Sequence, residues 1–560
     1  MNTTPRRGMG ERLLDAVEWV GNKLPDPVFL FLGCALLVMA LSAVGASMGW
    51  EVQPVRPAIV TEPLLDASGA PLLDAQGAPQ TRPVLDAKGA PVVELQSAGD
   101  PVRPRSLLSS EGLWWALQSM VSNFINFPPL GIVLAGMLGI GVAEKVGFFA
   151  AAMKWLALIT PGKLLTPMIV FIGVMSNVAS DAGYIVLPPL AAALYLALGR
   201  PPVVGIAAAF AGVSAGFSAN LLISATDALM AGLTTAGARI LDPNYTVNPT
   251  CNWYFLAAST FLLTLVGWAV TAWLVEPRLM KRVPEQGGPV PRSASELNQQ
   301  RLSPGEQRGL MLALVAELAA LAIVLALVLV PGWPLHGPVS DAPSAAPKWT
   351  QAVIPLIIFL FLAPALAYGW AVGEIRSQKD IAKAFTHAMA QMAPIIVLAF
   401  FAGQFIAYFR YSNLDQMLAF TGGKALVDAQ LPPSLLLVGI VVLTATVNLF
   451  MGSMSAKWTM LSPILVPMLM MTGMSPELTQ AAYRVGDSVT NVITPLNSYL
   501  VIILVALQRY NRSAGMGTLI ATMLPYALVF GVLWTIFLVA WVALGLPLGP
   551  DTNLQYIPAG

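Results

Sequence analysis

Nine stretches of the chain are long and apolar enough to be membrane-crossing helices, because a bilayer core of roughly 30 Å needs about 20 apolar residues in helical form. They alternate with shorter polar segments along the whole sequence. The predicted crossings are 27–49, 128–149, 203–235, 253–275, 309–332, 351–372, 386–410, 477–507 and 518–547. This pattern predicts an all-α polytopic membrane protein.

Two further apolar stretches do not fit as single crossings. Residues 165–198 and 436–473 are interrupted by Gly, Ser, Asn and Pro, and each has a polar cluster at its middle. Irregular backbone at membrane depth is tolerated only where it is buried in protein or lines a cavity. We therefore interpret 165–198 (hairpin 1) and 436–473 (hairpin 2) as re-entrant hairpins, which enter the membrane and leave it on the same side.

The positions of the basic residues agree with this count. Short cytoplasmic loops of membrane proteins carry an excess of Lys and Arg. With the N-terminus in the cytoplasm, the basic loops all fall inside, at 150–165, 199–202, 276–308, 373–385 and 508–517. The short outside loops at 236–252, 333–350 and 411–435 contain only Arg239, Lys348 and Lys424. If either hairpin crossed the membrane fully, every later loop would invert and this agreement would fail.

Two long segments lie outside the crossings. After the N-terminus and first span (1–49), loop 50–112 contains three copies of an Asp-Ala-x-Gly string, at 65–71, 73–79 and 85–91, and each copy is typical of a turn. This loop is either a periplasmic lid or partner site, or a loosely structured insertion of the kind that long loops tolerate. Segment 276–308 is a predicted cytoplasmic linker between the first half, 128–275, and the second half, 309–510.

A stretch of the first half recurs in the second half when the sequence is shifted by 274 positions. Segment 170–230 then aligns with 444–504 without a gap. The shared residues include Leu187 with Leu461, Pro189 with Pro463, Gly199-x-x-Pro202 with Gly473-x-x-Pro476, Gly212-x-Ser214 with Gly486-x-Ser488, and Ser224 with Ser498. Because the predicted hairpins enter from opposite faces, the repeats are inverted. Inverted repeats with broken helices are typical of secondary transporters, with the site near the midplane.

Polar side chains gather in four clusters within these repeats, although polar groups inside a membrane are costly and are usually functional or paired. Each hairpin and the crossing after it contribute one cluster apiece. The clusters are Ser176, Asn177, Ser180 and Asp181; Ser214, Ser218 and Asn220; Asn448, Ser453, Ser455, Lys457 and Trp458; and Arg484, Asp487, Ser488, Thr490, Asn491, Thr494, Asn497 and Ser498, with Pro495 among them. Hydrogen bonding between helices is the alternative role for the Ser and Asn side chains.

These residue types suit a hard cation or a carboxylate. Carbonyls freed at broken helices can join Asn and Ser oxygens around Na⁺, and exposed helix N-termini attract anions. Arg484 can hold a carboxylate through two parallel hydrogen bonds, and Asp181 and Asp487 are candidate ion- or proton-coupling acids. Alternatively, Arg484 and Asp487 neutralise each other, since positions i and i+3 share a helix face. Trp458 either stacks on an aromatic substrate or anchors hairpin 2.

The candidate site therefore draws on both halves of the chain. The candidate substrate-binding residues are Asn177, Asp181, Ser455, Trp458, Arg484, Asp487, Asn491 and Pro495. The candidate cation-coupling residues are Ser176, Asn177, Asp181, Asn220, Asp487 and Thr490, with a Na⁺ site expected at Asn177, Asp181 and Asn220.

Composition and charge exclude several other classes of protein. Hydrophobic residues make up 56% of the 560 positions and charged residues only 11%, whereas soluble domains carry about 25% charged residues. The net charge of +1 gives no field that would favour nucleic acid. Two cysteines and two histidines, without a His-Glu-x-x-His pair, do not suggest a disulfide framework or a zinc site, and no cofactor is expected. The absence of a P-loop argues against direct ATP drive.

At the clustered residues the chain resembles the AbgT family, the p-aminobenzoyl-glutamate transporters. The resemblance covers most of the chain, and loop 50–112 is longer than expected for the family. It rests on Ser-Asn-Val-Ala-Ser-Asp-Ala-Gly-Tyr at 176–184, Ser-Met-Ser-Ala-Lys-Trp at 453–458, and Tyr-Arg-Val-Gly-Asp-Ser-Val-Thr-Asn-Val-Ile-Thr-Pro at 483–495.

The resemblance implies a homodimer in the bacterial inner membrane, with nine crossings and two hairpins in each protomer. It implies elevator-type transport, in which a mobile part carries the site past a scaffold. It also implies a small anionic aromatic substrate: uptake of p-aminobenzoyl-glutamate, or export of sulfonamide-type drugs, coupled to Na⁺ or H⁺. Family residues of importance correspond to Asp181, Ser455, Trp458, Pro476, Arg484, Asp487 and Pro495.

Two alternatives remain. A Na⁺/dicarboxylate carrier of related inverted-hairpin design would use the same Asn motifs but has less need of an aromatic residue such as Trp458. An intramembrane hydrolase would need a Ser–Lys dyad, for which Ser453 or Ser455 with Lys457 is conceivable, but the pair is too local to be diagnostic. No residue is evident that would orient a base for that chemistry.

Overall fold

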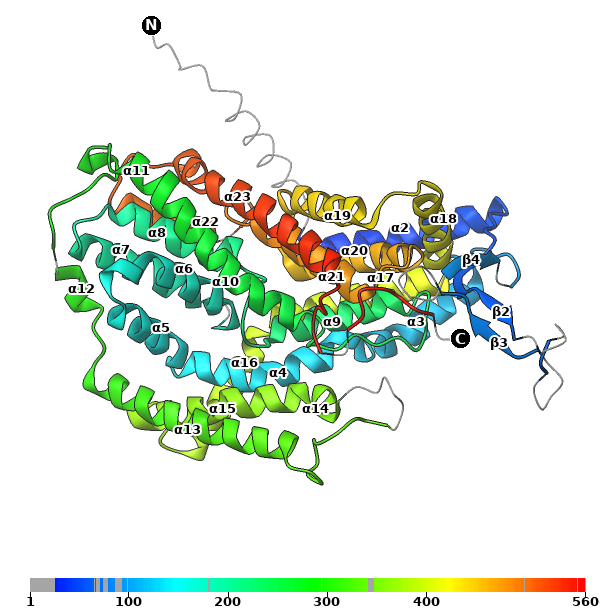
Figure 1. The fold of residues 1–560 in the computed structure, drawn as a ribbon, viewed down its shortest axis with the longest axis horizontal. Coiled ribbons are helices and arrows are strands. Elements are labelled where there is room, and N and C mark those ends of the chain that lie inside the picture. Colours follow the sequence, from blue (N-terminus) through cyan, green and yellow to red (C-terminus); the bar gives the residue numbers. More distant parts are fainter. Residues whose placement is uncertain are drawn as a thin grey trace, which may run out of the picture.

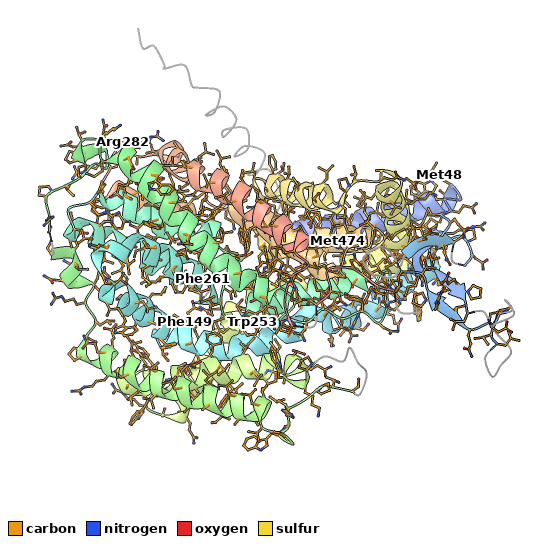
Figure 2. All side chains as sticks on the ribbon, in the orientation of Figure 1. Met48, Phe149, Trp253, Phe261, Arg282 and Met474 are labelled. Carbon is orange, nitrogen blue, oxygen red and sulfur yellow. The ribbon has the colours of Figure 1, made fainter. Side chains whose placement is uncertain are left out.

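The computed structural model describes residues 26–64, 66, 71–73, 79–85, 93–97, 99–179, 182–293, 295–340, 347–497, 499–550 and 552–558. Helices run along the long axis of the molecule, which carries the strands of loop 50–112 at one end and the helices of the linker, α11 (Glu276–Leu279) and α12 (Ser295–Gln299), at the other (Figure 1). Arg282 of the linker and Met48 at the end of the first span mark these two ends (Figure 2). This is the arrangement that the basic loops predict.

Seven helical segments of the described residues are long and apolar enough to cross a membrane. They are α2 (Pro27–Ser47), α3 with α4 (Ser110–Lys145), α10 through α11 (Trp253–Leu279), α13 (Pro304–Leu329), α15 (Val353–Val372), α17 (Ala393–Tyr411) and α23 (Met516–Ala543). Large apolar side chains point outward from them, including Phe261 on α10 with 57% of its surface exposed (Figure 2). A belt of exposed apolar side chains is expected of a surface that faces lipid.

Each predicted hairpin consists of two helices separated by a break. Hairpin 1 comprises α6 (Leu165–Met175), a 3-10 turn η2 (Ser176–Ala179) and α7 (Ala182–Ala197). Hairpin 2 comprises α19 (Pro433–Asn448) and α20 (Met454–Met470), so its first helix begins three residues before the predicted boundary. Figure 1 shows α6 and α7 toward the linker end, and α19 and α20 toward the strand end.

The crossings that follow the hairpins are not continuous helices. The predicted crossing 203–235 is divided into α8 (Pro202–Phe210), a π-helical turn η3 (Ala211–Ala215) and α9 (Ala225–Ala238). The predicted crossing 477–507 is divided into α21 (Pro476–Val489) and α22 (Tyr499–Gln508). Because each half is short, the described residues contain seven helices of spanning length, or eight spans if one bent pair is counted as a span, instead of the nine predicted.

Four segments correct the sequence-based boundaries. Helix α3 (Ser110–Ile125) precedes the crossing predicted to start at 128. Helix α5 (Phe148–Ile159) occupies a predicted inside loop and is bent by 118° from the segment 162–178. Helix α18 (Leu414–Asp428) occupies a predicted outside loop, and the crossing 386–410 is divided between α16 (Gln378–Gln391) and α17. The apolar criterion missed α5 and α18 because they are too short to span a bilayer.

Loop 50–112 contains β-structure, which corrects both the all-α assignment and the loosely structured interpretation of this loop. Strand β1 (Val55–Ile59) pairs with β4 (Val93–Ser97), and β2 (Thr61–Pro63) pairs with β3 (Thr81–Pro83), all antiparallel. Most positions of the Asp-Ala-x-Gly copies lie outside the described residues. Leu73 and Pro79, the first and last positions of the second copy, form an antiparallel bridge.

The equivalent glycines of the two repeats lie against the first helix of their own hairpins. A Cβ atom on Gly212 of η3 would meet the carbonyl oxygen of Val170 on α6 at 2.4 Å, and one on Gly486 of α21 would meet that of Val441 on α19 at the same distance. Only glycine allows such close approach of helix backbones. The shared sequence pattern of the repeats therefore corresponds to a shared packing contact.

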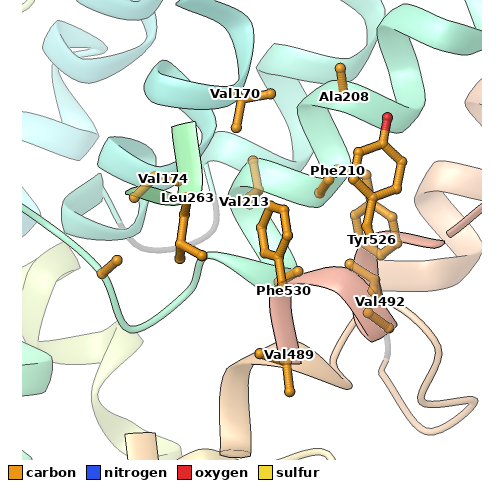
Figure 3. Close-up of a cluster of buried hydrophobic side chains, with 14 of the residues drawn as sticks. Val170, Val174, Ala208, Phe210, Val213, Leu263, Val489, Val492, Tyr526 and Phe530 are labelled. Atoms are coloured by element: carbon orange, nitrogen blue, oxygen red, sulfur yellow. The ribbon is translucent and has the colours of Figure 1, made fainter. Parts of the chain in front are cut away.

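The largest apolar core joins the two repeats. In Figure 3, Val170 and Val213 of the first repeat and Val489 and Val492 of the second surround Phe530 of α23. At the linker end, the base of hairpin 1 is fixed to α11, because Arg200 donates two 2.7 Å hydrogen bonds to Glu276. These contacts position hairpin 1 and both broken crossings against one another.

The last described residues pair with the turn that follows hairpin 2. Met474 and Gln555 form an antiparallel bridge. The amide of Tyr556 donates to the carbonyl of Gly473 at 2.9 Å, and the amide of Ser475 donates to that of Leu554 at 3.2 Å. Figure 1 places the C-terminal end of the chain near the strand end of the molecule.

Candidate functional site

Arg484 and Asp487 of α21 do not neutralise each other, which corrects one of the two sequence-based interpretations. Arg484 instead pairs with Asp227 of α9, with 2.6 Å between Nη1 and Oδ1, and both side chains are buried. The other oxygen of Asp227 accepts hydrogen bonds from the amide and hydroxyl of Ser224, each at 2.7 Å. Asp227 thus caps the start of α9 and holds the arginine at the same time.

Asp487 of α21 pairs with Lys457 of α20, which joins hairpin 2 to the crossing that follows it. The Lys457 Nζ lies 2.6 Å from Asp487 Oδ1, and neither side chain has exposed surface. Lys457 Nζ also donates to the side-chain oxygen of Asn448, the last residue of α19. Asp487 Oδ2 is buried without a hydrogen-bond partner among the described residues. The site therefore contains two buried ion pairs and no net charge from these four residues.

Trp458 anchors hairpin 2 in this conformation. Its ring is fully buried, and its centroid lies 4.3 Å from that of Tyr483 on α21. Its indole nitrogen donates to the hydroxyl of Thr234 on α9 at 2.9 Å, and Thr234 in turn lies 2.6 Å from the side-chain oxygen of Gln480. Of the two roles considered for Trp458, anchoring is the one observed.

The break between α21 and α22 connects hairpin 2 to the first repeat. Asn448 Nδ2 lies 2.8 Å from both Thr490 Oγ1 and Asn491 Oδ1. Asn491 also donates to the carbonyl of Ser214 in η3, at 3.4 Å, and the amide of Ser218 donates to the hydroxyl of Ser488 at 3.1 Å. Residues of the two predicted repeats therefore meet directly, as expected for a site at a repeat interface.

The expected Na⁺ site falls partly outside the described residues, because Asp181 is not among them. Ser176 and Asn177 lie in η2 and donate to the carbonyls of Gly173 and Val174, at 2.7 and 2.9 Å. Asn177 Oδ1 is buried and has no hydrogen-bond partner among the described residues, so it can accept from a ligand or coordinate a cation. Asn220 is buried in the break before α9.

The remaining candidates lie at helix starts and breaks. Ser455 is in the first turn of α20, with its hydroxyl 3.3 Å from that of Ser453. Pro476 is the first residue of α21, and Pro495 lies in the break between α21 and α22. Within the described part of the chain, Lys457 Nζ contacts Asn448 and Asp487 rather than either serine, so the geometry offers no Ser–Lys dyad.

Sequence reasoning left Asp227 unassigned and did not select Asn448, Lys457 or Tyr483 as site residues. A signal existed for Asp227, since an unpaired acid inside a predicted crossing needs a partner. Lys457 and Asn448 were noted in the polar cluster of hairpin 2, and Lys457 also as part of a possible dyad, but neither was given a partner in the site. Tyr483 was noted only as the first residue of the string at 483–495, because a single tyrosine inside a predicted crossing is ordinary.

Comparison with known proteins identifies the family. The profile of the AbgT transporter family matches residues 12–556. The chain is 34% identical over 550 residues to the p-aminobenzoyl-glutamate transport protein of Escherichia coli (strain K12), covering 98% of each protein.

Two solved structures are similar over nearly the whole chain. One is the YdaH transporter of Alcanivorax borkumensis, with 37% identity and a TM-score of 0.79, covering 94% of this chain and 100% of that chain. The other is MtrF of Neisseria gonorrhoeae, described among a class of antimetabolite efflux pumps, with 38% identity and a TM-score of 0.81, covering 95% of this chain and 97% of that chain. The chain is therefore a multi-pass membrane transporter and belongs to the AbgT family.

Proposed function

We propose that this chain is an ion-coupled secondary transporter of p-aminobenzoyl-glutamate or related aromatic carboxylates, and that it also exports sulfonamide-type antimetabolites. The Escherichia coli relative, a p-aminobenzoyl-glutamate transport protein, and the Neisseria gonorrhoeae relative, of a class of antimetabolite efflux pumps, support this substrate class. The proposal includes Na⁺ or H⁺ as the coupling ion, a homodimer in the inner membrane with a cytoplasmic N-terminus, and an elevator-type movement of the hairpins.

The proposal rests on the incomplete hydrogen bonding of the Arg484 guanidinium group. Its Nη1 is engaged by Asp227, its Nη2 makes only a 3.3 Å contact to the carbonyl of Ser218, and its Nε is buried without a partner among the described residues. Nε and Nη2 form one edge of the guanidinium group, which matches a carboxylate in two parallel hydrogen bonds. A substrate carboxylate that reached this edge would satisfy the unpartnered donor.

Aromatic side chains on the same helices favour an aromatic substrate. Trp458 and Tyr483 lie next to Lys457 and Arg484 in sequence and form a ring pair on α20 and α21. A benzoyl amide with carboxylates requires both cationic and aromatic surface, whereas a dicarboxylate such as succinate requires only cationic surface. Because both rings are buried here, substrate entry requires hairpin 2 to move away from α9 or α21.

Counterflow into proteoliposomes tests the proposal, with Na⁺ and pH gradients imposed separately. We expect p-aminobenzoyl-glutamate to compete with labelled substrate and succinate not to compete. Arg484→Ala and Asp487→Ala should abolish transport while membrane insertion persists. Lys383→Ala, which removes an exposed cation on α16, serves as the matched control and should transport normally. Equal competition by succinate, or full transport by both site variants, would rule the proposal out.

A further inference from the structure

A small hollow opens between α11 and α23 at the linker end of the molecule. Helices α10 and α23 pack side by side, and α10 continues through a π-helical turn, η4 (Thr271–Val275), into α11 (Figure 1). The lining of the hollow includes Leu274 of η4, Arg278 of α11, Arg282 just beyond α11, and Thr522 and Pro525 of α23. Its volume of about 30 Å³ has room for about two water-sized groups.

The hollow carries positive charge that no acid neutralises. Arg278 and Arg282 are the only charged residues of its lining. Neither guanidinium forms an ion pair within the described part of the chain. The neighbouring acid, Glu276, already accepts two hydrogen bonds from Arg200, and segment 277–283 contains three basic residues and no acidic one. Two unpaired guanidinium groups on one hollow attract an anion.

The residues around the hollow place it at the surface of the bilayer. Trp273 and Leu274 expose 76% and 50% of their surfaces, and Leu524 on the facing helix exposes 41%. Exposed apolar side chains on a membrane-spanning helix face lipid, and tryptophan is enriched where the hydrocarbon meets the headgroups. Arg278 and Arg282 follow Leu274 at intervals of four residues toward the end of the span. The two arginines therefore lie at headgroup depth, next to an apolar surface.

This combination fits a lipid better than a small soluble anion. A phosphate group accepts two parallel hydrogen bonds from a guanidinium group, and basic pockets between membrane helices bind the headgroups of anionic lipids. The hydroxyl of Thr522 donates to the carbonyl of Thr518 at 2.8 Å, which leaves its oxygen able to accept from a headgroup hydroxyl. A soluble anion would use the arginines but would leave the adjoining apolar surface without a function.

We propose that the hollow between α11 and α23 binds an anionic phospholipid, with its phosphate held by Arg278 and Arg282 and its acyl chains lying along η4 and α23. The lipid site is separate from the candidate substrate and cation residues, and it goes beyond the proposed function. Glu276, two residues before Arg278, holds the base of hairpin 1 through Arg200. The lipid therefore lies beside the attachment of that hairpin at the linker end.

Native mass spectrometry of the purified protein in a neutral detergent tests the inference. The protein is titrated with dioleoyl-phosphatidylglycerol or with dioleoyl-phosphatidylcholine, which has the same chains and no net charge. We expect phosphatidylglycerol to bind more tightly. Each arginine beside an anionic headgroup contributes about fivefold to affinity, so Arg278→Gln/Arg282→Gln should weaken binding of the first phosphatidylglycerol roughly 30-fold.

Lys379→Gln/Lys383→Gln is the matched control, because it removes two exposed cations from α16, outside the hollow. It should bind phosphatidylglycerol as the wild-type protein does. An equal loss in both double variants would overturn the inference, as would unchanged binding by Arg278→Gln/Arg282→Gln. Equal binding of the two lipids by the wild-type protein would also overturn it.

Two further measurements complete the test. Arg278→Gln changes a single exposed position and should weaken phosphatidylglycerol binding about fivefold, which decides the matter even if the double variant does not fold. Inorganic phosphate in excess should leave the bound lipid in place, and full displacement would show a site for free anions and refute the inference. These measurements need no substrate, so a failure of p-aminobenzoyl-glutamate transport would leave their outcome unchanged.

Discussion

We expect Asp227, which lies outside the recognised motifs, to be as important for stability and transport as the motif residue Arg484 with which it pairs. Asp227→Asn keeps the size of the side chain but leaves the Arg484 guanidinium buried without its counter-ion. Loss of one partner of a buried ion pair costs about 3–5 kcal/mol. The substitution also weakens the cap that Asp227 forms with Ser224, which is worth about 1 kcal/mol. We therefore expect a destabilisation of about 4–6 kcal/mol.

Two further variants separate the contributions of charge and cap. Ser224→Ala removes the hydroxyl donor to Asp227 and leaves the ion pair intact, so its cost should be near 1 kcal/mol. Asp227→Asn combined with Arg484→Met removes both charges. Its total should fall short of the sum of the single variants by about 2–3 kcal/mol, because the two residues are in contact.

The assay is equilibrium unfolding in mixed micelles with increasing SDS, followed by tryptophan fluorescence and compared with counterflow of the same preparations. Asp227→Asn should lose transport, whereas Ser224→Ala should retain it. If Asp227→Asn were no more destabilising than Ser224→Ala, the ion pair would contribute nothing measurable. The account of Asp227 and Arg484 as a stabilising buried ion pair would then be wrong.

The remaining predictions concern packing and topology. Gly486→Ala should destabilise the protein by about 1–3 kcal/mol, because its Cβ would meet the carbonyl of Val441. Gly439→Ala on α19, where no atom lies within 4 Å of the new Cβ, should be neutral or slightly stabilising in the same SDS titration, and equal effects would contradict the packing argument. Single cysteines in a cysteine-free background should be labelled from the cytoplasm at both ends of hairpin 1 and from outside at both ends of hairpin 2. Labelling of the two ends of either hairpin from different sides would contradict the topology. The positions are Lys163, Leu198, Leu431 and Thr472.

The sequence predicted the long helices and the hairpins because each has a local signature. Long apolar runs identified α13, α15 and α23, and interruptions by Pro, Gly and Asn identified α6 with α7 and α19 with α20. Helix α18 was missed because it is too short to span a bilayer and because Asp415, Gln416 and Lys424 interrupt its apolar pattern. The strands of loop 50–112 are short and contain proline, and strand pairing between residues about 40 apart has no local signature.

The sequence predicted which residues belong to the site, but not which of them form ion pairs with one another. Arg484 and Asp487 share one helix face, and spacing alone therefore suggested that they pair. In the structure, Arg484 contacts a residue 257 positions earlier and Asp487 contacts one in the preceding hairpin. Such contacts depend on how the two halves of the chain pack, which a single sequence does not reveal. The prediction of Trp458 left two roles open for the same reason.

The pairing of the C-terminal residues with the turn after hairpin 2 determines where attached proteins would be located. Because Tyr556 is hydrogen-bonded to Gly473, the segment 552–558 is held beside the turn that follows hairpin 2. With the proposed orientation, that turn is outside the cytoplasm. Alkaline phosphatase fused after residue 560 would then be active in intact cells. A bulky fusion without a spacer would also press on the base of hairpin 2 and hinder its movement.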